Sequence, residues 1–181
     1  VRCWSVRLLV EDPRVPGRVV TALAERAGKD DSGLVLCYLA SALQRLPAGQ
    51  CWPIARQLVA REEFSSDRVL PMMIWYGVEK AVGSNAEEGV TLAITARQSQ
   101  VRRYISRRLG EDLERNQQAV NRLVKALPTL AVARQEDILG GLLDALQAWP
   151  RAPQPEDWPA VQSVLATSES GKVKQRVQQL G

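Results

Sequence analysis

The sequence predicts an all-α protein, a right-handed α-solenoid of about ten or eleven helices stacked in antiparallel pairs that make about five repeats. Three observations carry this prediction. An apolar motif recurs about every 34 residues, each interval between two copies holds a second amphipathic segment, and strand patterns are almost absent. We therefore expect each repeat to bury an apolar face only against its neighbours.

The recurring motif opens the chain as VRCWSVRLL, with a valine, an aromatic residue three positions on and a leucine seven or eight positions on. Further copies are VLCYLASAL from Val35, VLPMMIWYG from Val69 and VRRYISRRL from Val101, with weaker copies from Gln135 and Val173. The starts at 1, 35, 69, 101, 135 and 173 differ by 34, 34, 32, 34 and 38. Such an interval is long enough for two helices and two turns.

If the motif is helical, one stripe of each copy turns inward. For the second copy this stripe is Val35, Tyr38, Leu39 and Leu43, and we expect all four side chains to be buried. Exposure of the whole set would contradict the repeat.

The second segment of each interval also has helical periodicity. The five segments span residues 15–28, 51–62, 86–98, 113–127 and 156–166. Val19, Leu23 and Ala27 share one face of the first segment, and Ile54 and Leu58 share one face of the second.

Prolines, glycines and small polar residues predict the helix boundaries. Pro16, Pro53 and Pro159 lie near expected helix starts, where a missing N–H costs nothing. Candidate N-caps are Ser32, Ser84 or Asn85, and Asp157. Helix ends are expected at Pro47, Gly83, Pro128 and Pro150.

A chain of 181 residues with 45% hydrophobic and 24% charged residues predicts one folded unit over 1–181. The proline-rich stretch PRAPQPEDWP marks a break near 150–156, either a loop or a hinge. No apolar run approaches the roughly 18 to 20 residues that span a bilayer, and no signal peptide is visible. Because the chain lacks an initiator Met and opens inside an amphipathic pattern, we expect a fragment of a longer protein.

The residue inventory excludes several kinds of site. No histidine is present, which excludes Ser-His-Asp and Cys-His catalysis and the usual histidine-containing zinc sites. The three cysteines, Cys3, Cys37 and Cys51, form no C-x-x-C pair; buried free thiols are favoured over a Cys37 to Cys51 bridge. Adjacent carboxylates such as Glu62 and Glu63 point about 100° apart on a helix. We expect no catalytic, cofactor-binding or metal site, no enzymatic activity and no small-molecule substrate.

The polar positions of the motif define a candidate surface. The sixth and tenth positions after each start share one helix face. At the sixth lie Arg7, Ser41, Trp75, Arg107 and Gly141, and at the tenth lie Glu11, Arg45, Glu79, Glu111 and Ala145.

Two interpretations of this face stay open. Glu11, Arg45 and Glu79 form either an ion-pair ladder between repeats, each exposed pair worth about 0 to 1 kcal/mol, or a polar floor for a protein partner. In the second case Trp75 and Tyr76 are aromatic anchors, although such a pair at helical spacing also suits a core.

A second candidate surface is basic. The segment RQSQVRRYISRR carries Arg97, Arg102, Arg103, Arg107 and Arg108 in twelve residues, and the chain has a net charge of +4. Helical-repeat proteins resembling the alkylpurine glycosylases bind DNA phosphates with such a face. The excess of positive charge is small, and acidic residues directly follow this segment. An acidic protein partner is therefore favoured, and nucleic-acid binding stays the alternative. The combined candidate surface is Arg7, Glu11, Arg45, Trp75, Glu79, Arg103 and Arg107.

The pattern of Val-Arg followed by aliphatics four and seven positions on resembles HEAT repeats over nearly the whole chain. The stretches VRCWSVRLLVED, LVLCYLASALQRLP, WPIARQL, LPMMIWYGVEKAV and VRRYISRRL are similar to the HEAT region of planctomycete-type membrane-bound dehydrogenases. Residues 1–109 match well and the remainder loosely.

Dehydrogenases of this family join a β-propeller, a HEAT solenoid and a cytochrome c domain. The resemblance implies a non-catalytic scaffold, the spacer of an exported electron-transfer protein, in the periplasm or at a membrane. Its partners would be neighbouring domains of that protein or an acidic protein. The propeller and the haem site are not in this sequence, so neither activity transfers to it.

Overall fold

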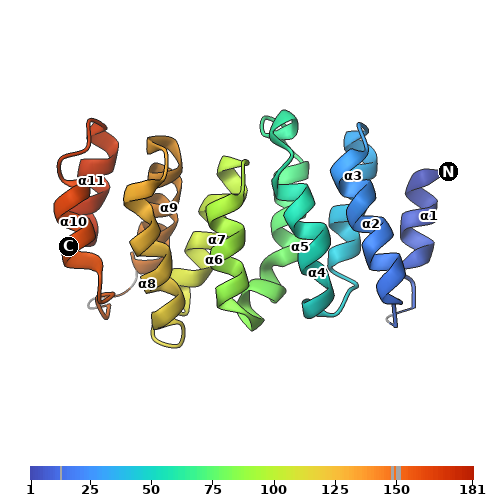
Figure 1. Ribbon diagram of the computed structural model, residues 1–181, viewed down its shortest axis with the longest axis horizontal. Coiled ribbons are helices and arrows are strands. Elements are labelled where there is room, and N and C mark those ends of the chain that lie inside the picture. The colour runs from blue at the N-terminus through green and yellow to red at the C-terminus, as the bar shows by residue number, and fades with distance from the viewer. Residues whose placement is uncertain (13, 148, 150–151) are drawn as a thin grey trace. The chain divides into compact units, whose positions relative to one another are not determined.

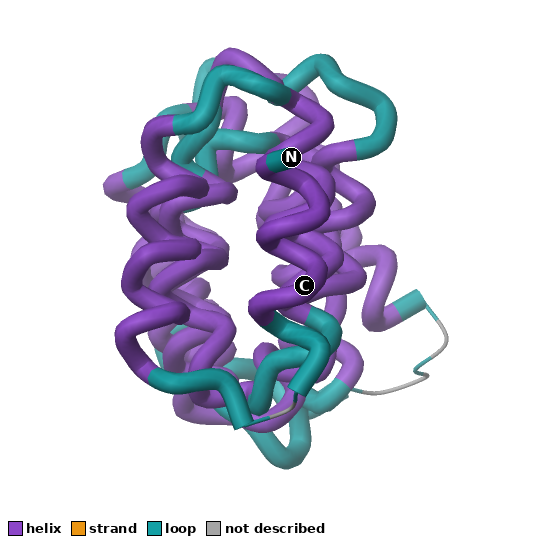
Figure 2. Tube along the Cα trace, turned by 90° about the vertical axis from the view of Figure 1, so that its right-hand side faces the viewer, coloured by secondary structure: helices purple, strands orange, loops and turns teal. Residues whose placement is uncertain are grey.

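Helices make up all the regular structure of residues 1–12, 14–147, 149 and 152–181, which are the residues that this computed structural model describes (Figure 1). Figure 2 likewise shows helices and loops but no strand in these ranges. Two short 3₁₀ turns, Glu62–Phe64 and Leu127–Thr129, accompany eleven α-helices. The helices are α1 (Arg2–Leu9), α2 (Gly17–Lys29), α3 (Gly33–Leu43), α4 (Ala48–Val59), α5 (Leu70–Ser84), α6 (Ala86–Thr95), α7 (Ser99–Glu111), α8 (Gln117–Ala126), α9 (Val132–Leu146), α10 (Trp158–Leu165) and α11 (Gly171–Leu180).

The all-α prediction and the number of helices are confirmed. The six motif copies fall in or beside the odd-numbered helices, and the five intervening segments fall in the even-numbered ones. The handedness of a solenoid and its HEAT-like character stay predictions.

The chain divides into two compact units. One comprises Val1–Ser84 with Thr95–Val101, and the other comprises Asn85–Ile94 with Arg102–Gly181. The chain passes between the two units within residues 84–102, and the break expected near 150–156 stays a prediction. Residues 150 and 151 of that stretch, including the helix end expected at Pro150, lie outside the described residues.

In the first unit, helices contact their second neighbours along the chain. Helix α3 packs between α1 and α5, while α2 packs on α4 in a second layer (Figure 1). Contacts of α4 with α3 and α5 join the two layers. The buried core between them includes Leu36, Leu39, Ile54, Leu58, Leu70 and Ile74.

The second unit repeats this alternation. Helix α9 packs on α11, and α8 packs on α10. Helix α8 also reaches α6 through Arg122, which donates to the hydroxyl of Thr91 at 2.8 Å and pairs with Glu87. The same spacing of contacts in both units agrees with a helical-repeat arrangement.

Several side-chain hydrogen bonds join residues about one repeat length apart in the sequence. Arg61 donates to the carbonyl oxygen of Ala27, 34 residues earlier, at 3.0 Å. Gln98 donates to the carbonyls of Leu58 and Arg61, 40 and 37 residues earlier. Arg134 donates to the carbonyl of Ile94, 40 residues earlier, at 3.3 Å. Each bond satisfies a carbonyl at or beside the C-terminal end of an even-numbered helix, where no intrahelical donor remains.

Most of the predicted helix boundaries agree with the structure. The hydroxyl oxygen of Ser32 accepts from the N–H of Val35 at 3.5 Å, and Asn85 Oδ1 accepts from the N–H of Glu88 at 3.2 Å. Gly83 lies in the last turn of α5 and Pro47 separates α3 from α4.

One boundary expectation is wrong, and a second holds in position only. Helix α4 begins at Ala48, so Pro53 lies inside it and not near its start. Its missing N–H leaves the carbonyl of Gly49 without the usual intrahelical donor. Asp157 lies at the N-cap position of α10, as expected, but its side chain does not cap the helix; its carboxylate accepts a hydrogen bond from Asn121 at 3.0 Å.

Candidate functional site

Exposed apolar side chains concentrate on the odd-numbered helices of the first unit. Trp4 is 61% exposed on α1, Leu34 is 64% exposed on α3 and Tyr76 is 52% exposed on α5. Helices α2 and α4, whose residues the structure describes in full, carry no exposed large hydrophobic side chain. The members of this group are Val1, Trp4, Leu8, Leu9, Leu34, Tyr38, Val69 and Tyr76. A one-sided distribution of this kind is typical of an interaction surface.

A groove of about 440 Å³ crosses this side of the unit. Helix α3 supplies its floor because Tyr38, Ser41 and Ala42 are three and four residues apart and share one face. The C-terminal end of α1 and the N-terminal end of α5 supply the two sides. The lining residues are Arg7, Val10, Cys37, Tyr38, Ser41, Ala42, Arg45, Val69 and Met73. We call this feature the α1–α3–α5 groove.

The exposure of Tyr38 contradicts the expectation that its side chain is buried. Val35, Leu39 and Leu43 are buried as predicted, but Tyr38 is 36% exposed and lines the groove. The periodicity of α3 places Tyr38 beside the inward stripe, and the phenol ring remains on the groove side of that stripe. In the sequence, a tyrosine beside the apolar positions of a helix is the feature that could have indicated a partly exposed groove residue.

Two arginines give the groove a positive charge. Arg7 lies over the ring of Trp4, with 5.3 Å between the guanidinium carbon and the ring centroid, and Arg45 follows the end of α3. Within the described ranges, neither guanidinium has a carboxylate partner. Both charges are therefore available to an anionic ligand.

The ion-pair ladder expected from Glu11, Arg45 and Glu79 is not formed: these three exposed side chains make no ion pair among the residues that the structure describes. Ion pairs between repeats form elsewhere in the first unit. Arg2 pairs with Asp30 at 2.9 Å, and Arg97 pairs with Glu62 at 2.8 Å.

The predicted surface on α5 is only partly in the groove. Met73 lines it, whereas Glu79 and the half-buried Trp75 do not. Tyr76, next to Trp75, is exposed. The sequence therefore identified Arg7 and Arg45 of the groove but missed Met73 and Val69, because flexible apolar residues at a helix start resemble ordinary core positions.

Cys37 contributes no negative charge to the groove. Burial, with a smaller contribution from Asp67, raises the pKa of its thiol, which therefore stays protonated near neutral pH. All three cysteines are free thiols, as favoured from the sequence, but only Cys51 is buried; Cys3 and Cys37 are half-buried. Cys51 is buried and donates to the carbonyl of Leu43 at 3.3 Å.

The arginines of segment 97–108 are neutralised by carboxylates. Arg102 is only 3% exposed and pairs with Asp137; burial lowers the pKa of its guanidinium. Arg103 donates twice to Asp144, at 2.7 and 2.9 Å, and these hydrogen bonds raise its pKa. The remaining pairs are Arg97 with Glu62, Arg107 with Glu111 and Arg108 with Asp112. The expected basic face therefore lacks unpaired arginines, and Arg102 does not belong to it.

No group of histidine, cysteine or acidic side chains in the described part of the chain is placed to hold a metal ion. Among the same residues, no helix is long and apolar enough to cross a bilayer.

Comparisons with protein-family models, with curated proteins and with solved structures find no significant match to this chain. The similarity to the HEAT region of membrane-bound dehydrogenases therefore stays a prediction from the quoted motifs.

Proposed function

We propose that this chain is a non-catalytic helical-repeat scaffold that binds a protein partner in the α1–α3–α5 groove. The observation that carries the proposal is the chemistry of the groove: the guanidinium groups of Arg7 and Arg45 have no carboxylate partner in the described chain and lie beside exposed aromatic and aliphatic side chains. Arginine, tyrosine and methionine are all enriched in protein–protein interfaces relative to the rest of the protein surface.

The groove favours an acidic segment with apolar anchors. Arginine binds carboxylates through two parallel hydrogen bonds, so Arg7 and Arg45 each suit an aspartate or glutamate of the partner. Tyr38, Val69 and Met73 supply apolar contact area in the same groove. The charges set orientation and association rate, and the apolar contacts supply most of the affinity.

The resemblance of the quoted motifs supports a finer proposal about the parent protein. The scaffold is the spacer of a larger exported dehydrogenase, between a β-propeller and a cytochrome c domain, in the periplasm or at a membrane. Its acidic partner is then a neighbouring domain of that protein. Reading the gene on both sides tests this proposal: a propeller upstream and a C-x-x-C-H motif downstream support it, and unrelated flanking domains contradict it.

A peptide titration tests the groove directly. The probe is a fluorescein-labelled peptide that alternates aspartate with leucine and phenylalanine; its matched control replaces each aspartate by asparagine. We expect fluorescence anisotropy to show binding of the acidic peptide and at least about tenfold weaker binding of the control. Equal affinities for the two peptides would contradict the proposal.

Single substitutions locate the binding site. Arg45→Ala and Arg7→Ala should each lower the affinity for the acidic peptide about tenfold, because each removes a charged hydrogen-bond donor from the groove. Arg18→Ala is the matched control, because Arg18 is exposed on α2 and does not line the groove. If Arg18→Ala weakens binding as much as Arg45→Ala does, the peptide responds to net charge and not to the groove.

A further inference from the structure

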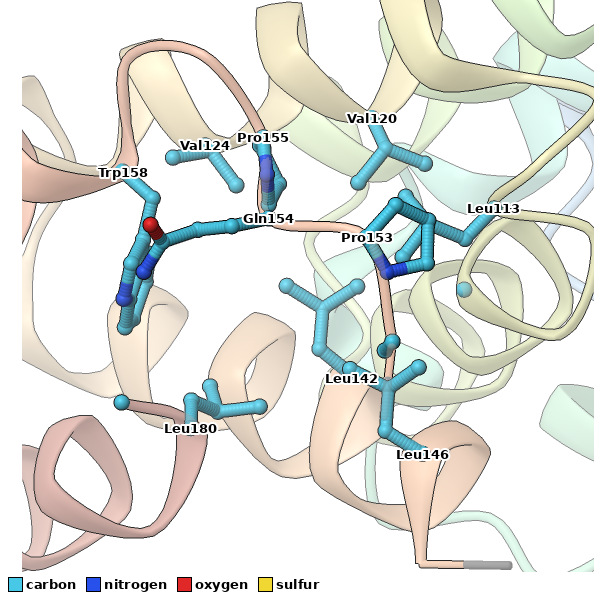
Figure 3. Close-up of a pocket in the computed structure, with 13 residues that line it drawn as sticks. Leu113, Val120, Val124, Leu142, Leu146, Pro153, Gln154, Pro155, Trp158 and Leu180 are labelled. Carbon is cyan, nitrogen blue, oxygen red and sulfur yellow. The ribbon is translucent and has the colours of Figure 1, made fainter. Parts of the chain in front are cut away.

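The second unit contains an apolar cavity that the proposed partner binding does not use. Its volume is about 130 Å³, and it lies among α8, α9, α10 and α11 beneath the segment 152–155 (Figure 3). The lining residues are Gly110, Leu113, Val120, Val124, Leu142, Leu146, Ala152, Pro153, Gln154, Pro155, Trp158, Leu180 and Gly181. We call it the Trp158 cavity.

Apart from the amide of Gln154 and the indole N–H of Trp158, the side chains that line the Trp158 cavity are apolar, and none is charged. Leu113, Val120, Val124 and Leu142 are each no more than 4% exposed. Pro153 and Pro155 in the covering segment lack N–H groups, so the segment lines the cavity without presenting unpaired backbone donors at these two positions. These features exclude an ionic ligand and favour a neutral one.

One end of the cavity is polar. Figure 3 shows the side chain of Gln154 extending alongside the ring of Trp158, while Leu113 and Val120 lie at the opposite end. Trp158 is 3% exposed, and no residue that the structure describes accepts a hydrogen bond from its Nε1–H. A buried donor without an acceptor costs about 1 to 3 kcal/mol, so an acceptor within reach of Nε1 is favoured.

We infer that the Trp158 cavity binds a small, neutral and largely apolar molecule with one hydrogen-bond acceptor, such as a cyclic or aryl ketone, and that the Nε1–H of Trp158 donates to this acceptor. The volume suits a single six-membered ring, since an engineered cavity of about 150 Å³ in another protein holds benzene. The sequence predicted no small-molecule site, because solenoid surfaces seldom provide a pocket with convergent polar groups.

The inference is tested by NMR on the complete ¹⁵N-labelled chain with a matched pair of probes. Cyclohexanone and methylenecyclohexane have the same shape, but only the ketone has an acceptor. We expect cyclohexanone to move the indole N–H proton signal of Trp158 downfield and methylenecyclohexane to leave it nearly unchanged. Both compounds should shift the methyl signals of Val124 and Leu142. An indole signal that stays in place with cyclohexanone would overturn the inference.

Substitution of Trp158 separates the hydrogen bond from the apolar contacts. The Trp158→Phe variant identifies the indole signal of Trp158, because that signal disappears. The substitution should lower the affinity for cyclohexanone about three- to tenfold and change the affinity for methylenecyclohexane less than twofold. An equal loss for the two compounds would mean that the ring contributes contact area only and would contradict the role of the donor.

A filled cavity should exclude both probes. Val124→Phe places a ring in the cavity and should abolish the probe-induced shifts while circular dichroism shows the helices intact. If Val124→Phe prevents folding, Val120→Leu is used in its place, because it adds only a single methylene. It should lower the affinity for both probes. Probe-induced shifts that persist unchanged in a folded filled variant would place the binding site elsewhere and overturn the assignment.

Discussion

The guanidinium of Arg61 donates a hydrogen bond of 3.0 Å to the carbonyl oxygen of Ala27, 34 residues earlier in the chain. Ala27 lies in the last turn of α2, where helix carbonyls have no intrahelical donor, and Arg61 follows α4. Arg61 is 8% exposed and also pairs with Glu63. One side chain therefore joins two successive repeats at the ends of their helices.

Removal of this connection should destabilise the first unit. We expect Arg61→Ala to lower the free energy of unfolding by about 1 to 3 kcal/mol, because the Ala27 carbonyl loses a buried donor. Arg18→Ala, at an exposed site on α2, is the control and should change it by less than about 0.5 kcal/mol. Urea denaturation followed by circular dichroism measures both variants. Equal stabilities of the two variants would show that the carbonyl does not depend on Arg61.

Gly77 in α5 packs directly against α3. A Cβ atom at this position would lie 2.7 Å from the carbonyl oxygen of Ala40 and 2.8 Å from the Cβ of Leu43. We expect Gly77→Ala to destabilise the protein by about 1 to 3 kcal/mol, because the two helices must separate. Gly49→Ala in α4, where nothing lies within 4 Å, should be neutral or stabilising by up to about 1 kcal/mol. Thermal unfolding compares them, and a stabilised Gly77→Ala variant would contradict the close approach of α3 and α5.

Cys51 should make stability depend on pH in the alkaline range. Burial raises the pKa of its thiol from 9.0 to about 11, so the folded state retains a proton that the unfolded state releases above pH 9. The unfolding free energy contributed by this group is fully present below pH 9. It falls between pH 9 and about 11, with a slope of at most about 1.4 kcal/mol per pH unit.

Cys51→Ala is the matched variant for this effect. Urea denaturation at pH 8 and pH 10 should show a smaller loss of stability in Cys51→Ala than in the unmodified chain, because other alkaline groups titrate equally in both. Identical losses would show that the Cys51 thiol is not protected. A disulfide reagent at pH 8 should correspondingly modify Cys51 only after denaturation.

Nucleic-acid binding is the alternative that the basic segment 97–108 raises. It predicts an affinity that falls steeply with salt, with a log–log slope that Arg103→Ala and Arg107→Ala make shallower. Because Asp144 and Glu111 already neutralise these arginines, we expect duplex DNA to bind more weakly than the acidic peptide, with an unchanged slope in both variants. A slope reduced by about one unit per arginine would instead support the alternative.

The candidate groove was predictable in part. Arg7 and Arg45 follow from their positions in the repeated motif, because offsets of three and four residues place side chains on one helix face. Their lack of carboxylate partners was not predictable. The motif suggested that Glu11 and Glu79 would pair with Arg45, but side chains on neighbouring helices meet only when the rotation and register of those helices match, and motif offsets do not specify either quantity.

The sequence by itself determined that the chain is helical, that it forms ten or eleven helices and, except for Tyr38, which side chains of α3 turn inward. Val35, Leu39 and Leu43 show this for α3, as does the cap of Ser32. These features depend on interactions within about four residues, which the order of residue types specifies directly.

Only the tertiary structure decided which polar groups pair and which surfaces stay open. It buries Arg102 against Asp137, exposes Tyr38 in the groove, forms the Trp158 cavity and groups the chain into two compact units. Each of these results depends on how residues about 35 positions apart are brought together by packing between repeats. Small rotations of a helix change such contacts without changing its periodic pattern, so the same pattern is compatible with several pairings.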